Sequence, residues 1–145
     1  MPFFTYDTSF IVSHKLSDLP DNFLLSSVVL LELIASAKDE STLKQYERLR
    51  KVYEKDDTLI VPNSEDWLLA SKILYWLEQG RKKKAGGKSP PKKRGVTQSM
   101  ALDVLIAVSA RRYNAIVVTE NWDDFKAIQY YCNVKLMRGK VFLKR

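Results

Sequence analysis

Residues 100–119 decide the fold, and they read MALDVLIAVSARRYNAIVVT. Apolar residues at helical spacing predict a helix from Met100 to Tyr113. Residues 115–119 are then almost continuously apolar, which predicts a strand that is buried on both faces. Such strands are typical of parallel sheets covered by helices, so this segment favours an α/β fold.

The rest of the chain repeats this alternation of helix and strand. Short apolar runs predict further strands at 3–7, 58–62, 134–137 and 141–143. Helical spacing predicts helices over 28–35, 43–53, 64–79 and 123–131, the third with Gly80 as its C-cap. The pattern indicates one three-layer α/β/α domain over residues 1–145, built on a central, mainly parallel sheet. Ligands of such sheets bind beyond the carboxyl ends of the strands.

The positive charge of the chain is concentrated in one segment. The 145 residues include 24 Lys and Arg against 17 Asp and Glu, which gives a net charge of +7. Eight of these basic residues and no acidic one lie within 81–95, so the remainder has 24 minus 8, or 16, basic residues against 17 acidic ones. The glycines, prolines and like charges of residues 81–95 predict a flexible loop inserted into the domain.

Composition also bears on where the protein works and on which metal sites it can form. No stretch approaches the ~18–20 apolar residues of a membrane span, so a membrane partner is not expected. The first residues, Met1–Asp7, lack the basic and then apolar pattern of a secretory signal. Cys132 is the only cysteine, so a reducing, cytoplasmic location is expected. With one histidine and one cysteine, the chain cannot supply a His/Cys zinc site.

Three acidic residues lie where the apolar pattern predicts none. Glu32 and Asp103 each interrupt an apolar helix, and Asp7 follows the first strand. Asp and Glu are almost never fully buried unless they are paired. A separate buried salt bridge could partner each acid, although no Lys or Arg lies within four residues of Glu32 or Asp103. One shared cation is the simpler explanation, and all-oxygen ligands suit Mg²⁺ or Mn²⁺.

The motifs around these acids resemble those of the PIN-domain nucleases, most closely the VapC-type toxins of toxin–antitoxin pairs. The resemblance covers nearly the whole chain, and the order and spacing of the motifs are specific. The four matching motifs are Tyr6-Asp7-Thr8-Ser9, Ser27 through Glu32-Leu33, Asp103-Val104-Leu105-Ile106-Ala107, and Val118-Thr119 through Asp124-Phe125.

The resemblance implies a set of site residues. Asp7 and Asp103 would be the main metal ligands, and Glu32 would complete the metal site directly or through a bound water. Asp124 would be the fourth carboxylate of the catalytic cluster. The hydrogen-bonding groups around these ligands would be Ser9, Thr119 and Asn121.

The resemblance also implies an activity and partners. The protein would be a metal-dependent endoribonuclease and the toxin of a toxin–antitoxin system. Mg²⁺ or Mn²⁺ would activate a water for in-line attack on an RNA phosphodiester, without a covalent intermediate. The implied partners are an RNA substrate, a cognate antitoxin protein and a second copy of the chain in a homodimer.

One residue departs from the family pattern. Asn121 stands where many relatives carry Asp, which leaves the number of metal ions open, one or two. Glu120 or Asp123 could compensate for the missing carboxylate. Because of Asn121, the alternative function is a non-catalytic PIN-like RNA-binding module. A nucleotide-binding α/β protein is disfavoured, because no Gly-rich loop follows the first strand.

RNA binding is the function we assign to the basic segment, since a carboxylate cluster alone repels phosphate. A solvated loop without a fixed role and a docking site for an acidic antitoxin segment are the alternatives. We expect the aromatic residues near the end of the chain, Trp122, Phe125, Tyr130 and Tyr131, to pack in the core. The expected RNA-binding residues are Arg81, Lys82, Lys83, Lys84, Lys88, Lys92, Lys93 and Arg94.

Deletion of residues 81–95 is therefore predicted to weaken RNA binding and leave the domain folded. Each lost phosphate contact should reduce the slope of log K against log salt by about 0.7 for single-stranded RNA. A salt titration of RNA affinity measures this, and unchanged affinity would contradict the assignment.

Overall fold

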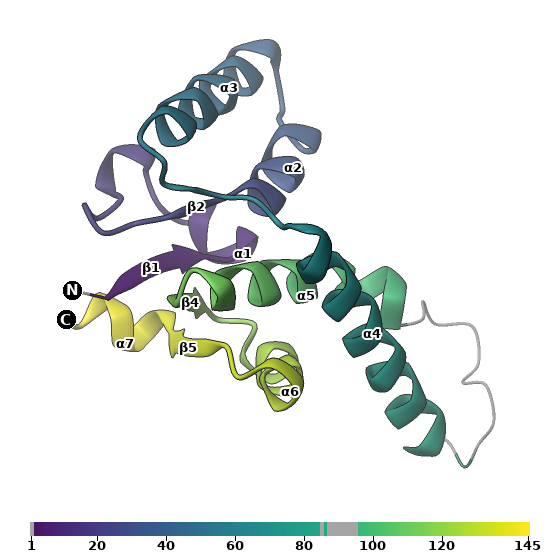
Figure 1. The fold of residues 1–145 in the computed structure, drawn as a ribbon. Coiled ribbons are helices and arrows are strands. Elements are labelled where there is room, and N and C mark those ends of the chain that lie inside the picture. The colour runs from purple at the N-terminus through teal and green to yellow at the C-terminus, as the bar shows by residue number, and fades with distance from the viewer. Residues whose placement is uncertain (1, 85, 87–95) are drawn as a thin grey trace.

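A computed structural model describes residues 2–84, 86 and 96–145, and shows a parallel sheet surrounded by helices (Figure 1). The central sheet has the strand order β1-β4-β5, and a second sheet pairs β2 with β3. A bridge between Phe4 and Phe23 connects the first sheet to the segment that leads into β2. All pairings are parallel among the described residues. The strands are β1 Phe3–Tyr6, β2 Leu25–Ser26, β3 Leu59–Ile60, β4 Ala115–Thr119 and β5 Lys135–Arg138.

Seven α-helices and one 3-10 helix complete the described part of the chain. The central helix is α5, which contacts β4, α2, α4 and α6. Helices α6 and α7 contact β5, and α7 also contacts β4, so the predicted α/β/α fold with a parallel sheet is confirmed. The helices are α1 Thr8–Ile11, α2 Ser27–Ala35, α3 Glu40–Lys55, α4 Ser64–Lys84, α5 Val96–Arg112, α6 Trp122–Cys132 and α7 Gly139–Leu143, and the 3-10 helix is Leu16–Asp18.

Helix α5 packs closely because its inner face carries small residues. Ala107 and Ala110 are fully buried there, next to Val117 and Val118 of β4, which are also fully buried. A second part of the core is aromatic. The ring of Tyr6 lies edge-on to those of Phe10, Phe23 and Phe142, which joins β1, α1 and α7. The carboxyl end of β1 is therefore held from several sides.

Two predictions about where elements lie along the chain were wrong, besides the loop prediction for residues 81–84. Residues 141–143, predicted as a strand, belong to helix α7, whose Lys140 amide donates to Glu120 and whose Phe142 ring packs on Phe4 and Tyr6. These tertiary contacts outweigh the local strand pattern. Gly80 does not end a helix but lies within α4.

Helix α4 therefore takes in the first part of the predicted basic loop. Residues 81–84 are its last turn, where Arg81 pairs with Glu78 at 3.0 Å and where cations interact favourably with the helix dipole. The loop prediction is wrong for these four residues. The other assigned RNA-binding residues, Lys88, Lys92, Lys93 and Arg94, lie outside the described residues.

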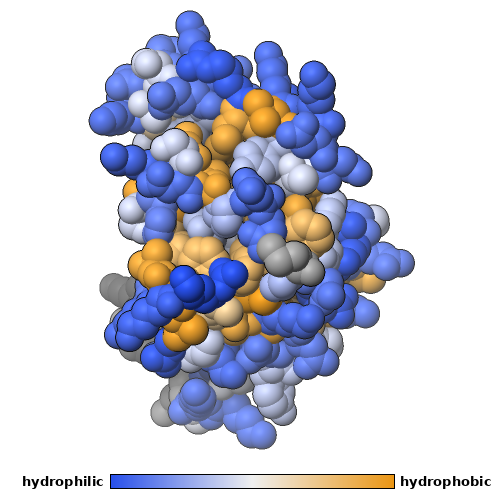
Figure 2. Space-filling view, turned by 90° about the vertical axis from the view of Figure 1, so that its left-hand side faces the viewer, coloured by the Kyte–Doolittle hydropathy of each residue, from blue (hydrophilic) through white to orange (hydrophobic). Residues whose placement is uncertain are grey.

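The molecular surface mixes apolar and hydrophilic side chains. Figure 2 shows apolar patches across the middle of the face that carries the two chain termini. Within residues 2–84, 86 and 96–145, no helix combines the length and apolar character of a membrane span.

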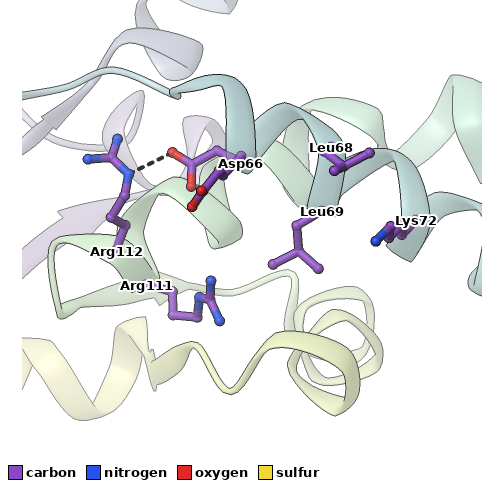
Figure 3. Close-up of a pocket in the computed structure, with 7 residues that line it drawn as sticks. Asp66, Leu68, Leu69, Lys72, Arg111 and Arg112 are labelled. Atoms are coloured by element: carbon purple, nitrogen blue, oxygen red, sulfur yellow. Dashed lines mark hydrogen bonds and ion pairs between the residues drawn. The ribbon is translucent and has the colours of Figure 1, made fainter.

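An ion pair between a buried carboxylate and a partly exposed guanidinium connects the start of α4 to the end of α5. Asp66 is only 3% exposed and accepts from Arg112 Nε at 2.9 Å (Figure 3). Arg112 also donates to the Val61 carbonyl at 2.6 Å. Asn63 caps α4 by accepting from the Asp66 amide, while the Asp66 carboxylate accepts from the Asn63 amide in return. The Asp66 carboxylate thus accepts hydrogen bonds both from the backbone at the start of α4 and from the Arg112 guanidinium.

Asp66→Ala is predicted to destabilise the fold by about 2 kcal/mol or more, because it leaves Arg112 without its carboxylate and removes half of the α4 cap. Glu65→Ala is the matched control, since Glu65 is exposed in the same helical turn. Urea denaturation of both variants measures the difference. Equal stabilities of the two variants would refute the assigned role of the pair.

Candidate active site

The parallel register of β1 and β4 places two side chains together at one edge of the sheet. Tyr6 pairs with Val118, so the residues that follow, Asp7 and Thr119, emerge side by side. Thr119 Oγ1 donates to Asp7 Oδ2 at 2.6 Å, and Thr119 is fully buried. The site therefore begins at the carboxyl ends of parallel strands, the position that this class of fold predicts.

Asp7 is a buried carboxylate held only by neutral donors. It is 2% exposed, caps α1 by accepting from the Phe10 amide at 3.0 Å, and also accepts from Ser9 Oγ at 3.1 Å. Burial raises the pKa of Asp7 above its usual range, although the hydrogen bonds from Thr119, Phe10 and Ser9 oppose the rise. No Lys or Arg forms an ion pair with Asp7 among the described residues.

Glu32 reaches the same region from helix α2. That helix begins after Ser26, whose side chain accepts from the Val28 and Val29 amides. Glu32 is partly buried, and its Oε1 accepts from Thr8 Oγ1 at 2.5 Å. Thr8 directly follows Asp7, so this bond ties α2 to the end of β1. The sequence analysis did not assign Thr8 a role, although it belongs to the first motif.

An amide bridges the two remaining carboxylates. Asn121, at the start of α6, donates through Nδ2 to Asp103 Oδ2 and to Asp124 Oδ2, both at 3.1 Å. The Asn121 backbone amide donates to Thr119 Oγ1 at 2.9 Å, which connects this group to Asp7. A side-chain amide has two N–H donors, and each is used here on a different acid. Asn121, the residue that departs from the family pattern, thus supplies hydrogen-bond donors between the carboxyl groups of Asp103 and Asp124.

The electrostatics show that the four acids are neighbours. The pKa of Asp103 rises from its ordinary value of 3.8 to about 7, mainly because the side chain is buried. Repulsion from Asp7, Glu32 and Asp124 raises it further, and the Asn121 hydrogen bond lowers it. Among the described residues, no ion pair involves any of the four, since the pairs found are Arg50–Glu54, Arg81–Glu78 and Arg112–Asp66. Separate salt bridges therefore do not explain these acids.

The other acidic candidates take different places. Glu120 Oε1 accepts from the Lys140 amide at 2.8 Å at the start of α7, and its charge contributes to the raised pKa of Asp7. Asp123 is exposed in the first turn of α6. Asp66, which is buried and paired, was missed as a buried acid because its position after Ser64 also fits ordinary helix capping.

The donor set suits a hard divalent cation. All four groups are carboxylates, and their mutual repulsion is the kind that a bound cation relieves. No three His, Cys, Asp or Glu side chains of the described chain already converge as a metal-holding group. Mg²⁺ does not need such a cage, because proteins hold it with one or two carboxylates while it keeps several waters. Asp7 and Asp103 therefore suffice in number and chemistry.

Comparison with protein-family models identifies the family of the chain. Residues 5–129 match the model described as PIN domain. The chain belongs to the PIN domain family. PIN domains are in general nucleases, and the match includes every acid of the cluster. No curated protein matches this PIN domain significantly.

Solved structures share the fold of this PIN domain at low sequence identity. A chain of VapBC2 from Rickettsia felis, bound to a promoter DNA fragment, matches with a TM-score of 0.57 and 20% identity over 94% of this chain and 98% of that chain. DNA-bound VapBC from Salmonella typhimurium matches with a TM-score of 0.56 and 17% identity over 95% of this chain and 98% of that chain. VapBC-1 from nontypeable Haemophilus influenzae matches with a TM-score of 0.54 and 21% identity over 94% of this chain and 97% of that chain.

Asp103→Asn is predicted to stabilise the metal-free protein at about pH 8 by on the order of 1–3 kcal/mol, because it removes a buried charge next to three others. The folded protein binds the Asp103 proton more tightly than the unfolded chain does, since its folded pKa is raised. Wild-type stability should therefore fall as pH rises from about 4 to about 7, and the gain of the variant should vanish near pH 4.

Denaturation in EDTA across this pH range measures the effect. Asp123→Asn serves as the control, since Asp123 is exposed. A gain that is the same at both ends of the range would rule out the assigned charge repulsion.

Proposed function

We propose that this PIN domain is a metal-dependent endoribonuclease that cleaves RNA phosphodiester bonds. The observation that carries the proposal is a hydrogen-bonded chain at the carboxyl edge of a parallel sheet, in which Thr119 and Asn121 connect the carboxyl groups of Asp7, Asp103 and Asp124, none of which has an ion-paired partner among the described residues. Structural proteins of this size have no reason to keep such a cluster, since its repulsion opposes folding. A nuclease site has a reason to keep such a cluster, because the metal ions that stabilise the charge on a phosphate need carboxylate ligands.

In this proposal Asp7 and Asp103 hold Mg²⁺ or Mn²⁺, with Glu32 as a further ligand and Asp124 as the fourth carboxylate. The bound ion would supply an activated water and stabilise the charge that develops on the phosphate. Thr119 and Ser9 fix the orientation of Asp7 through hydrogen bonds, and Thr8 does so for Glu32.

Asn121 has a positioning role in the same proposal. Its amide donates to both Asp103 and Asp124 and so holds the two carboxyl groups in one orientation. Hydrogen bonds of this kind around metal ligands commonly change activity by about 10–100-fold when they are removed. The Asn121 amide carries no charge with which to bind a second cation. The proposal is therefore a site that holds a single metal ion.

We further propose that the chain is the toxin of a toxin–antitoxin pair. The similar solved structures are VapBC complexes, in support of an antitoxin partner. Large apolar side chains that lie exposed, such as Leu31, Trp67 and Leu68, offer surface for an antitoxin or for a second copy of the chain. A nuclease that acts on cellular RNA would work in the cytoplasm, where Cys132 stays reduced.

The test is cleavage of single-stranded RNA by the purified chain with Mg²⁺ or Mn²⁺. We expect Asp7→Asn and Asp103→Asn each to lower the cleavage rate by about 100-fold or more, because each removes a metal ligand. EDTA should abolish cleavage, whereas Asp123→Asn should cleave like the wild type. The rate is measured by gel electrophoresis of end-labelled RNA.

The second candidate is a non-catalytic PIN-like RNA-binding module, which the amide at position 121 favours. The same experiment separates the two functions. RNA binding without metal-dependent cleavage would establish the module and reject the nuclease. Cleavage that survives both Asp7→Asn and Asp103→Asn would reject the assigned site.

A further inference from the structure

Three adjoining hollows lie on the surface where α4 meets α6, away from the carboxylate cluster. Their volumes are about 340, 740 and 540 Å³. The first shares Gly80 and Tyr131 with the second, and the second shares Lys126 and Tyr130 with the third. They adjoin at these shared side chains, and we call the three hollows together the α4–α6 groove. Its side chains come from the end of α4, from α6 and from the segment that leads into β5.

Aromatic rings form the ridge of the α4–α6 groove. Tyr130 is 82% exposed, and its ring lies edge-on to Tyr131 at a centroid distance of 4.9 Å. On the other side, Tyr131 stacks with Trp76 at 5.4 Å, and Trp76 is itself 39% exposed. The prediction of core packing is right for Phe125, which is fully buried, but wrong for Tyr130. An exposed ring that rests on a second ring, itself stacked on a third, is suited to contact a ligand.

The charges that line the α4–α6 groove are all positive among the described residues. No Asp or Glu lines any of the three hollows. Arg81 has an ion-pair partner in Glu78, at 3.0 Å, whereas Lys126 donates only to the neutral Gln129 in the bonds found. The five cations of the lining are Arg81, Lys83, Lys84, Lys126 and Lys135.

Helix α6 connects the α4–α6 groove to the proposed active site. Asp124 lies in its first turn and Tyr131 in its last, seven residues later. At 1.5 Å per residue, the two lie about 10 Å apart along the helix axis. A flexible polyanion of a few nucleotides can therefore contact both at once.

We propose that the α4–α6 groove binds unpaired nucleotides of single-stranded RNA, with a base stacked on Tyr130 and the phosphates near the lysines. This rests on the proposed ribonuclease function and deepens it by naming where substrate binds outside the cluster. Exposed aromatic rings interleaved with cations are the standard means by which proteins bind single strands. An acidic peptide would satisfy the lysines, but it would leave the exposed ring of Tyr130 without a flat partner.

The test measures the affinity of the full chain for a short fluorescein-labelled oligouridylate by anisotropy, in EDTA so that no cleavage occurs. We expect Tyr130→Ala to raise Kd by about 5- to 100-fold, which is the range for loss of one base–aromatic stack. Tyr130→Phe keeps the ring and should bind like the wild type. Tyr75→Ala removes another exposed ring, from α4, that does not line the groove, and it should also leave Kd unchanged.

A second probe separates stacking from charge. An oligomer of the same length with abasic sugars keeps its phosphates, so Tyr130→Ala should bind it as the wild type does. With Mg²⁺ restored, Tyr130→Ala should raise KM for RNA cleavage far more than it lowers kcat, since it removes binding rather than chemistry.

The outcomes distinguish the groove from the nuclease function. If Tyr130→Ala binds oligouridylate like the wild type while cleavage persists, the groove proposal falls and the nuclease stands. If the wild-type chain neither binds nor cleaves RNA, both fall. If Tyr130→Ala leaves RNA affinity intact but loses a co-expressed antitoxin, the groove is a protein-docking surface and the proposal is again refuted.

Discussion

Mutual repulsion among four carboxylates is the constraint on which this structure depends. Asp7, Glu32, Asp103 and Asp124 are close enough for three of them to raise the pKa of the other, Asp103. Neutral donors hold them in place: the hydroxyls of Thr8 and Thr119, and the amide of Asn121. Such donors orient a carboxyl group without forming an ion pair with it. A site that must attract cations requires this arrangement.

The rest of the fold keeps protein cations away from that cluster. Arg112, at the end of α5, is bound to Asp66 and to the Val61 carbonyl, nine residues from Asp103 on the same helix. At 1.5 Å per residue this separation is about 13 Å, so the guanidinium does not reach the acids. The Asp66–Arg112 pair therefore has two effects: Asp66 caps the start of α4, and it holds the Arg112 guanidinium away from the carboxylate cluster.

The sequence predicts those parts that depend on local pattern. The strands at residues 3–7 and 115–119 and the acids interrupting α2 and α5 are evident from periodicity alone, and they bring the site to the correct edge of the sheet. The rest depends on contacts distant in sequence. Strand β2 has two residues, too short for any pattern, and α7 forms around a ring and a carboxylate from other elements. The bridging role of Asn121 requires Asp103, eighteen residues away.

The same physics bears on the proposed ribonuclease function, which would need cations outside the carboxylate cluster. The chain without residues 81–95 has a net charge of −1, and a carboxylate cluster repels the phosphates of RNA unless a cation is bound to it. Attraction must therefore come from a separate surface that lies near enough to guide the strand. Lys126 is on α6, two residues after Asp124, yet it forms no ion pair with the cluster among the described residues. Its ammonium instead lies 5.8 Å from the Trp122 ring centre and donates to Gln129. Helix α6 thus carries Lys126 and Asp124 without an ion pair between them, so in the proposed function each would act on the same RNA strand without neutralising the other.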